Sequence, residues 1–203
     1  MTLVIGITGG IASGKSTISS YYRSLGIPII DADVEARLAV ENGEPAYNEI
    51  VHYFGETILH KDGTINRALL GEIVFNNEGK LQVLNSIVHP DVRRRMEKKK
   101  KEAIQAHESA VILDIPLLFE NKLNEMVDRT ILVYVDERIQ MERLMKRNNL
   151  NVDQAKSRIN AQMPLSSKVS LADEIINNNG TKENAIEQAQ LILRKWKVRT
   201  VEN

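Results

Sequence analysis

The chain has 203 residues, its 27 lysines and arginines balance its 27 aspartates and glutamates, and it contains no cysteine. The length suits one domain with room for a small insertion, and the zero net charge argues against a dedicated nucleic-acid-binding or membrane-surface protein. The lack of cysteine excludes disulfides, thiolate catalysis and cysteine-ligated zinc. The sequence shows neither a signal peptide nor an apolar run of about 18 residues, so we expect a cytoplasmic protein.

The strongest pattern lies near the N-terminus, where the apolar residues 3–7 predict a strand that is buried on both faces. Directly after it, Gly9, Gly14, Lys15 and Ser16 match the pattern G-x-x-x-x-G-K-[ST]. In this P-loop the glycines let backbone N–H groups point at phosphate oxygens, the lysine reaches the β- and γ-phosphates, and the hydroxyl can ligate Mg²⁺. A chance match would lack the strand before it and the helix after it, so we predict a nucleoside triphosphate site.

A helix is predicted over residues 16–25, and a second strand over residues 27–30 leads into Asp31 and Asp33. Two carboxylates at i and i+2 at the end of a strand project to the same side, and ligands bind at the carboxyl ends of parallel strands. Alternatively, one of the two caps the next helix, predicted over residues 34–40, since aspartate is a preferred N-cap. Both interpretations can hold at once.

Between residues 42 and 107 the strand signals disappear and helical patterns take their place. The stretch is too long for a simple crossover connection, whose loops are usually a few residues long. We therefore interpret it as a helical insertion that binds the second substrate. The helices are predicted over residues 46–54, 66–75 and from Leu81 onward, with a turn at residues 61–63.

The last of these helical patterns contains two further features. His89 and Pro90 are expected to break it, because proline suits the first turn of a new helix; His89 is either structural or faces the ligand. Residues 93–101 form a strongly basic run, interpreted as a solvated helix face with Glu97 and Glu102 as partners. One or two of its cations are candidates for phosphate contact. The run has no interleaved aromatic residues, which argues against nucleic-acid binding.

Three later apolar stretches, residues 110–114, 130–135 and 174–177, predict further buried strands. The first ends in Asp114, where an acid helps to hold Mg²⁺ in P-loop proteins. Because strands and helices alternate after a P-loop, we predict an α/β fold of the P-loop NTPase type, a three-layer α/β/α arrangement with a parallel sheet. We expect a core (about 1–33, 108–136 and 170–203), a helical acceptor-binding insertion (about 34–107) and a lid (about 137–169).

A charged helix is predicted over residues 136–147, with Arg138, Arg143 and Arg147 four or five residues apart on one face. Repeated arginines just beyond a P-loop core suit a lid that closes on phosphates. The alternative is an ordinary exposed face on which Glu137 and Glu142 pair with these arginines. Further helices are predicted over residues 151–163 and 181–198, with a turn at residues 178–180.

Sequence features outside the P-loop distinguish between classes of P-loop protein. Regulatory GTPases need a base-reading [NT]-K-x-D segment, and the nearest matches, residues 121–124 and 181–184, lack the aspartate. A short chain with a helical insertion and an arginine lid predicts a small-molecule kinase. A slowly hydrolysing ATP-dependent switch and a kinase of another nucleoside or nucleotide are the alternatives.

The chain resembles the dephospho-CoA kinase family, on motifs that follow the family's order over nearly the whole sequence. These are residues 8–17 (TGGIASGKST), 31–33 (DAD), 71–75 (GEIVF), 89–90 (HP), 116–120 (PLLFE), Arg143 with Arg147, and 178–180 (NNG). The resemblance implies transfer of the γ-phosphate of ATP to the ribose 3′-hydroxyl of dephospho-CoA. Two positions depart from the family's pattern: Ala12 replaces a frequent glycine, and an acid at Asp114 is not a regular feature.

The resemblance also implies roles for single residues: residues 12–17 would cradle ATP, Asp33 would be the base facing the ribose hydroxyl, His89 would lie by the acceptor, and Arg143 would belong to the lid. The candidate catalytic residues are Asp33, Lys15 and Arg143. The candidate nucleotide-binding residues are Gly10, Ile11, Ala12, Ser13, Gly14, Lys15, Ser16, Thr17, Arg143, Arg147 and Asn178. The candidate acceptor-binding residues are Asp31, Asp33, His89 and Leu117, and the candidate metal ligands are Ser16, Asp31 and Asp114. The expected cofactors are ATP and Mg²⁺, and the expected partner is dephospho-CoA, with no nucleic acid and no membrane. We expect a monomer or a small homo-oligomer.

Overall fold

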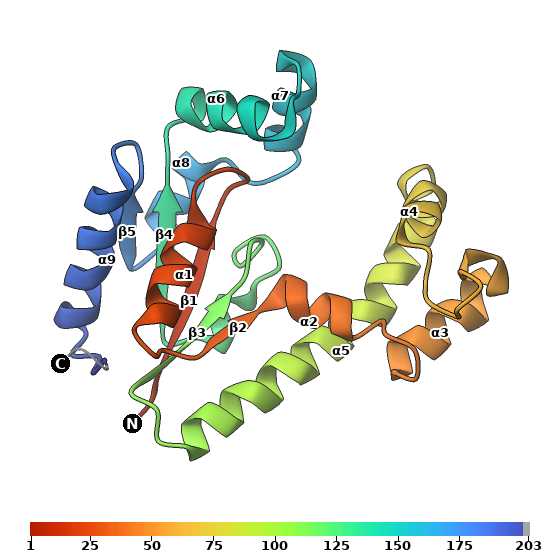
Figure 1. The fold of residues 1–203 in the computed structure, drawn as a ribbon, viewed down its shortest axis with the longest axis horizontal. Helices are drawn as coiled ribbons and strands as arrows, with labels where there is room; N and C mark the ends of the chain where they lie inside the picture. The colour runs from red at the N-terminus through yellow and green to blue at the C-terminus, as the bar shows by residue number, and fades with distance from the viewer. Residues whose placement is uncertain (201–203) are drawn as a thin grey trace. The chain divides into compact units, whose positions relative to one another are not determined.

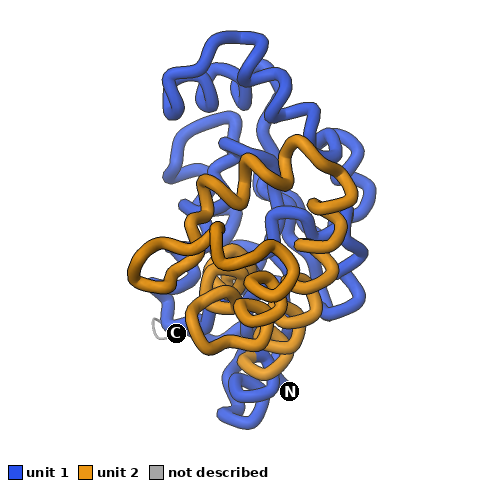
Figure 2. The backbone as a smooth tube through the Cα atoms, turned by 90° about the vertical axis from the view of Figure 1, so that its right-hand side faces the viewer, with its two compact units in different colours: residues 1–30, 100–203 blue, residues 31–99 orange. Residues whose placement is uncertain are grey.

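The structure is a computed structural model that describes residues 1–200. It divides into two compact units, one made of Met1–Ile30 and Lys100–Asn203 and the other of Asp31–Lys99, which Figure 2 colours separately. Within the described residues, five strands form one sheet in the order β2-β3-β1-β4-β5 (Figure 1). The strands are β1 (Leu3–Gly9), β2 (Ile29–Asp31), β3 (Ala110–Asp114), β4 (Arg129–Tyr134) and β5 (Glu174–Asn177).

The register of the central strands brings their carboxyl ends to one edge of the sheet. Strand β1 pairs in parallel with β3 and β4, and β4 pairs in parallel with β5. Ile7 lies opposite Asp114, and Gly9 lies opposite Val133. The loop that leaves β1 therefore starts beside the end of β3. The predicted α/β class and parallel sheet are confirmed.

The helices of the first unit pack on this sheet through its apolar side chains. Ile18 and Tyr22 of α1 and Ala189 and Leu193 of α9 belong to the same buried cluster as the strand residues, so these two helices cover one face (Figure 1). A smaller cluster of Leu132, Val135 and Leu165 lies by α8. The helices of this unit are α1 (Lys15–Ser24), α6 (Glu137–Asn148), α7 (Val152–Asn160), α8 (Leu165–Lys168) and α9 (Lys182–Lys195), with short 3₁₀ turns η2 (Leu123–Met126) and η3 (Val169–Leu171).

The second unit is helical and has its own core. Tyr47, Ile50 and Ile58 pack against Leu70 and Val74 in one buried cluster. Its elements are α2 (Ala32–Leu38), α3 (Pro45–Phe54), η1 (Glu56–Ile58), α4 (Arg67–Phe75) and α5 (Glu78–Gln105), whose last residues belong to the first unit. Within residues 1–200, no helix combines the length and the apolar character that a membrane span requires.

The predicted break at His89 and Pro90 is wrong, because α5 continues through both residues from Glu78 to Gln105. Proline in a helix removes one N–H donor and displaces the carbonyl one turn earlier, here that of Ser86. Pro90 and Ser86 are both exposed, so water can satisfy that carbonyl. Neighbouring residues of the same helix, Ile87 and Val88, pack on the core of the second unit and hold the helix together.

Candidate active site

The P-loop connects β1 to α1, and its shape depends on one glycine. Gly14 has φ +93°, which favours glycine, and a Cβ there would overlap the side-chain amide of Asn178. That amide donates a hydrogen bond from Nδ2 to the backbone oxygen of Ser13 at 2.7 Å. Asn178 follows β5, so the structure brings this predicted nucleotide-binding residue onto the P-loop. It lies 165 residues from Ser13 in the sequence.

The lysine of the P-loop pairs with the acid at the end of β3. Lys15 forms an ion pair with Oδ1 of Asp114, and the Ser19 hydroxyl donates to Oδ2 at 2.6 Å. The Asp114 side chain is almost fully buried, whereas that of Lys15 is 17% exposed. Both carboxylate oxygens are thus engaged by side chains of α1, and a direct metal contact by Asp114 would replace one of these interactions. Ser16, the other predicted metal ligand of this unit, is exposed in the first turn of α1.

The predicted lid, α6 and α7, presents its three arginines differently. Arg138 pairs with Glu142 at 2.7 Å on an exposed face, as the alternative interpretation expected. Arg147 donates from Nε to the side chain of Asn148 at 2.9 Å. Arg143 is half-buried and makes no ion pair with any side chain in residues 1–200. It therefore carries an uncompensated positive charge that an anionic ligand can use.

No sequence pattern indicated the buried lysine that lies beside the P-loop. Lys168 of α8 is fully buried and pairs with Oε1 of Glu120 at 2.7 Å. Its ammonium also lies 3.4 Å from the backbone oxygen of Gly9 and 3.5 Å from that of Pro116. The pair therefore joins the start of the P-loop to the segment after β3. Leu117, a predicted acceptor contact on that segment, is exposed.

In the second unit, Asp31 caps α2. Its Oδ1 accepts hydrogen bonds from the backbone N–H groups of Asp33 at 2.9 Å and Val34 at 3.1 Å. The helix begins at Ala32 rather than at Val34, so Asp33 lies in its first turn. The prediction that Asp31 and Asp33 sit at i and i+2 on an extended strand end is therefore wrong, because the cap turns the chain into a helix one residue earlier.

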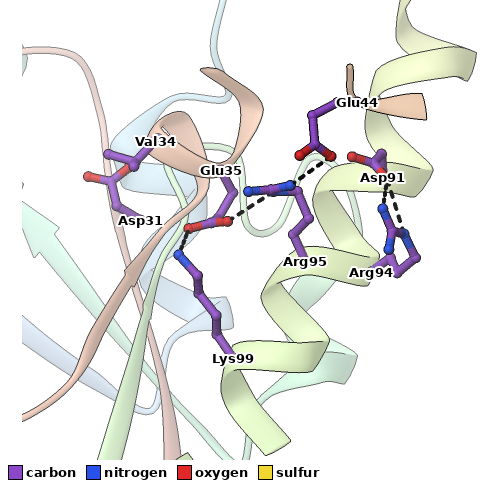
Figure 3. A network of polar contacts seen from close by, with 8 residues as sticks. All are labelled: Asp31, Val34, Glu35, Glu44, Asp91, Arg94, Arg95 and Lys99. Carbon is purple, nitrogen blue, oxygen red and sulfur yellow. Dashed lines mark hydrogen bonds and ion pairs between the residues drawn. The ribbon is translucent and has the colours of Figure 1, made fainter. Parts of the chain in front are cut away.

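Three cations of the basic run of α5 are paired with carboxylates other than Glu97 and Glu102, the partners expected from helical spacing (Figure 3). Glu35 of α2, only 1% exposed, pairs with Lys99 and, at 3.3 Å, with Nε of Arg95. Arg95 also reaches Glu44 at 3.1 Å. Arg94 pairs with the buried Asp91 of the same helix. Glu35 therefore ties α2 to α5.

His89 lies on α5 among these cations and is exposed. Partial burial of the imidazole lowers its pKa, and the positive charge of Arg93 one turn later lowers it further. Both effects favour the neutral imidazole over the cation.

Comparison with known proteins identifies the family. The family model described as dephospho-CoA kinase matches residues 3–184. The chain is 54% identical over 198 residues to the dephospho-CoA kinase of Bacillus anthracis, covering 98% of this chain and 99% of the relative. For the dephospho-CoA kinase of Geobacillus kaustophilus the identity is 53%, with 97% and 98% covered.

Solved structures agree with this assignment. The structure of TT1252 from Thermus thermophilus has a TM-score of 0.85 at 32% identity, covering 98% of this chain and 99% of that chain. The dephospho-CoA kinase from Campylobacter jejuni has a TM-score of 0.75 at 28% identity, with 97% and 98% covered. The chain belongs to the dephospho-CoA kinase family.

Proposed function

We propose that the protein transfers the γ-phosphate of ATP to the ribose 3′-hydroxyl of dephospho-CoA, which gives coenzyme A. The observation that carries the proposal is the formed P-loop of a chain in this family, with Lys15 in the first turn of α1. The first N–H groups of a helix lack partners within the helix, so they and the lysine favour a bound phosphate.

The charges of the first unit suit the nucleotide. Lys15 can exchange its contact with Asp114 for the β- and γ-phosphates, and Arg143 supplies a further positive charge from the lid. A bound Mg²⁺ ion neutralises charge on the transferring phosphate. No group of three acidic or histidine side chains within residues 1–200 is arranged to hold a metal by itself. Mg²⁺ is usually held by one or two protein ligands together with substrate phosphates; Ser16 would hold it, with Asp31 and Asp114 as candidate acids.

Asp33 is proposed as the base that accepts the proton of the ribose hydroxyl. One oxygen of Asp31 already accepts two backbone hydrogen bonds at the start of α2, which suits it to a positioning or metal-binding role. Asp33 lies in the first turn of the same helix, and its own backbone N–H is one of those donors. His89 and Leu117 are proposed contacts of the acceptor.

Two variants separate the roles of the aspartates. Asp33→Asn is expected to lower turnover by about 10²–10⁴-fold while ATP still binds. Asp31→Asn is expected to raise the Mg²⁺ concentration that half-maximal turnover requires. Titration of Mg²⁺ against turnover in both variants distinguishes them. A shifted metal requirement in Asp33→Asn, with Asp31→Asn merely slow, would mean that the two roles are reversed.

The acceptor is tested by a coupled assay of ADP release. We expect turnover with dephospho-CoA to exceed by far that with nucleosides, with other nucleotides and without acceptor. Equal ADP release without acceptor would favour an ATP-dependent switch, and a preference for another nucleoside would favour a different kinase. We also propose a cytoplasmic location. We propose that the protein is a monomer or a small homo-oligomer, and sedimentation of the purified protein measures this oligomeric state.

A further inference from the structure

Two consecutive peptides of the P-loop, Gly10–Ile11 and Ile11–Ala12, are each held by a glutamine of the predicted lid. The backbone N–H of Ile11 donates to Oε1 of Gln162 at 2.8 Å, and Nε2 of Gln140 donates to the backbone oxygen of Ile11 at 2.8 Å. Gln140 lies on α6 and is buried, and Gln162 follows α7. Both polar groups of the Ile11 backbone are thus occupied by side chains that lie 129 and 151 residues away in the sequence.

The residue that follows Ile11 has a backbone conformation that alanine rarely adopts. Ala12 has φ +59°, in the left-handed region. The backbone N–H of Ser13 donates to the oxygen of Gly10 at 3.1 Å, which makes Ile11 and Ala12 the central residues of a four-residue turn. A positive φ at the second central position normally calls for glycine, and a residue with a Cβ is disfavoured there. An interaction from outside the turn is therefore needed to keep the φ of Ala12 positive.

The hydrogen bond from Gln140 can do this. The central peptide of such a turn has two orientations, one with positive φ at the second central residue and one with negative φ. Reversal of the peptide would relieve Ala12, but it would turn the Ile11 oxygen away from Gln140. No peptide bond within residues 1–200 is cis, so the N–H of Ala12 points opposite to the Ile11 oxygen. The bond to Gln140 therefore fixes the direction in which the Ala12 N–H points.

We propose that Gln140 and Gln162 are positioning residues of the kinase: Gln140 holds the Ile11–Ala12 peptide in the orientation that offers the Ala12 N–H to a phosphate of ATP, and Gln162 holds the preceding Gly10–Ile11 peptide. The inference rests on the proposed role of this loop in ATP binding. It also gives the base of the lid a direct connection to the phosphate site, through two consecutive peptides.

The test removes the side-chain amide of each glutamine. For Gln140 the substitution is made both in the wild-type chain and in a chain with glycine at position 12. Gln140→Leu and Gln162→Leu, each in the full chain, are expected to raise the KM for ATP about tenfold, as for loss of one intramolecular hydrogen bond, with a smaller change in kcat. Ala12→Gly removes the steric penalty of the positive φ. In the Ala12→Gly protein, the effect of Gln140→Leu on the KM for ATP is expected to shrink to less than about threefold.

Gln190→Leu is the matched control, because Gln190 lies on α9 and its side chain makes no hydrogen bond within residues 1–200. It is expected to leave the KM for ATP unchanged. Chemical unfolding of every variant separates stability from binding. A purely structural role would lower the unfolding free energy equally with and without Ala12→Gly and leave the KM for ATP unchanged, and that result would overturn the proposal.

ATP affinity, measured by titration calorimetry without acceptor, separates this inference from the proposed function. Normal ATP binding by the wild-type protein without phosphorylation of dephospho-CoA would refute the proposed acceptor and leave the inference standing. If the wild-type protein bound no ATP, both would fall. An equal loss of ATP affinity for Gln140→Leu with and without Ala12→Gly would overturn the inference alone.

Discussion

Two sets of cations are used differently: Lys15 and Arg143 of the first unit, and three cations of α5 in the second unit. Lys15 shares Asp114 with Ser19, and Arg143 makes no ion pair within the described residues. On α5, Arg94, Arg95 and Lys99 are each paired with a carboxylate, and Glu35, which pairs with two of them, is almost fully buried (Figure 3). A cation that lacks an ion pair remains available to an anionic substrate, whereas Arg95 and Lys99 join α5 to α2 through Glu35.

The basic run of α5 is the densest group of cations in the sequence. It has seven cations within residues 93–101, against single lysines and arginines around the P-loop. In the structure, the cations that face Glu35, Glu44 and Asp91 already have their charge compensated. The distribution of acids therefore matters more than the number of cations.

The largest expected effect is that of Arg143→Ala. An arginine that acts on the transferring phosphoryl group contributes about 10³-fold or more to turnover. A surface ion pair contributes only about 0–1 kcal/mol to stability, and Arg143 has none to lose in the described residues. We expect turnover to fall by at least this factor with little change in the unfolding midpoint. Arg138→Ala, which removes the exposed pair with Glu142, is the matched control. A lower midpoint with intact turnover would show that Arg143 is not part of the lid function.

Lys15→Ala is expected to reduce turnover by about 10²–10³-fold, since it removes a charge that stabilises the transition state. It also leaves the buried Asp114 carboxylate without its cation, which costs about 3–5 kcal/mol of stability. Lys15→Ala/Asp114→Asn should therefore recover stability without recovering turnover. Asp114→Asn alone reports what the acid contributes. Turnover restored in the double variant would remove Lys15 from the mechanism.

Glu35→Gln tests the second unit. Loss of charged hydrogen bonds to Arg95 and Lys99 is expected to lower the unfolding free energy by about 1.5–3 kcal/mol, with less than a tenfold change in turnover. Glu44, which is more exposed and within residues 1–200 forms an ion pair with Arg95 alone, provides the control: Glu44→Gln should cost about 0–1 kcal/mol. The distinction between the units would fail if Glu35→Gln reduced turnover as strongly as Arg143→Ala.

The smallest effect concerns pH. Burial alone would raise the pKa of Asp173, but hydrogen bonds from Thr130 and Arg129 outweigh it and lower the pKa below its usual 3.8. A lowered pKa in the folded state stabilises the fold above the unfolded-state pKa, and this stability is lost as pH falls through the folded-state value. As the pH is lowered below about 5, the unfolding midpoint of Asp173→Asn should therefore fall less steeply than that of the wild-type protein. The exposed Asp153→Asn should leave this slope as in the wild-type protein.

Much of the first unit could be predicted from its sequence. Strands such as β3 consist of consecutive buried residues, and the P-loop spacing is local, so the backbone shape follows from neighbouring residues. Asp114, predicted as a metal ligand, ends β3, and Asn178, predicted to bind the nucleotide, follows β5; the parallel order of the sheet brings both to the P-loop. A local pattern combined with a simple sheet rule is sufficient for these positions.

Other features could not be predicted, for identifiable reasons. The break at Pro90 was expected from a local rule, but packing of the neighbouring turns prevails. The expected cap by one of the two aspartates is confirmed for Asp31, but the i, i+2 pattern does not show that this cap starts the helix at Ala32 and so places Asp33 in its first turn. Gln140, Gln162 and Lys168 have no periodic signal, and the P-loop atoms that they contact, in Ile11 and Gly9, lie more than 100 residues away. Only the folded chain brings such pairs together.

The most direct test of the difference between the units is the stabilisation of the protein by ATP. A ligand that binds only the folded state raises the unfolding midpoint, because it adds RT ln(1 + [L]/Kd) to the unfolding free energy. With ATP and Mg²⁺, we expect the same rise in the midpoint for the wild-type protein and Glu35→Gln, and almost none for Lys15→Ala/Asp114→Asn. A full rise in the double variant, or its loss in Glu35→Gln, would contradict the assignment of the phosphate site to the first unit.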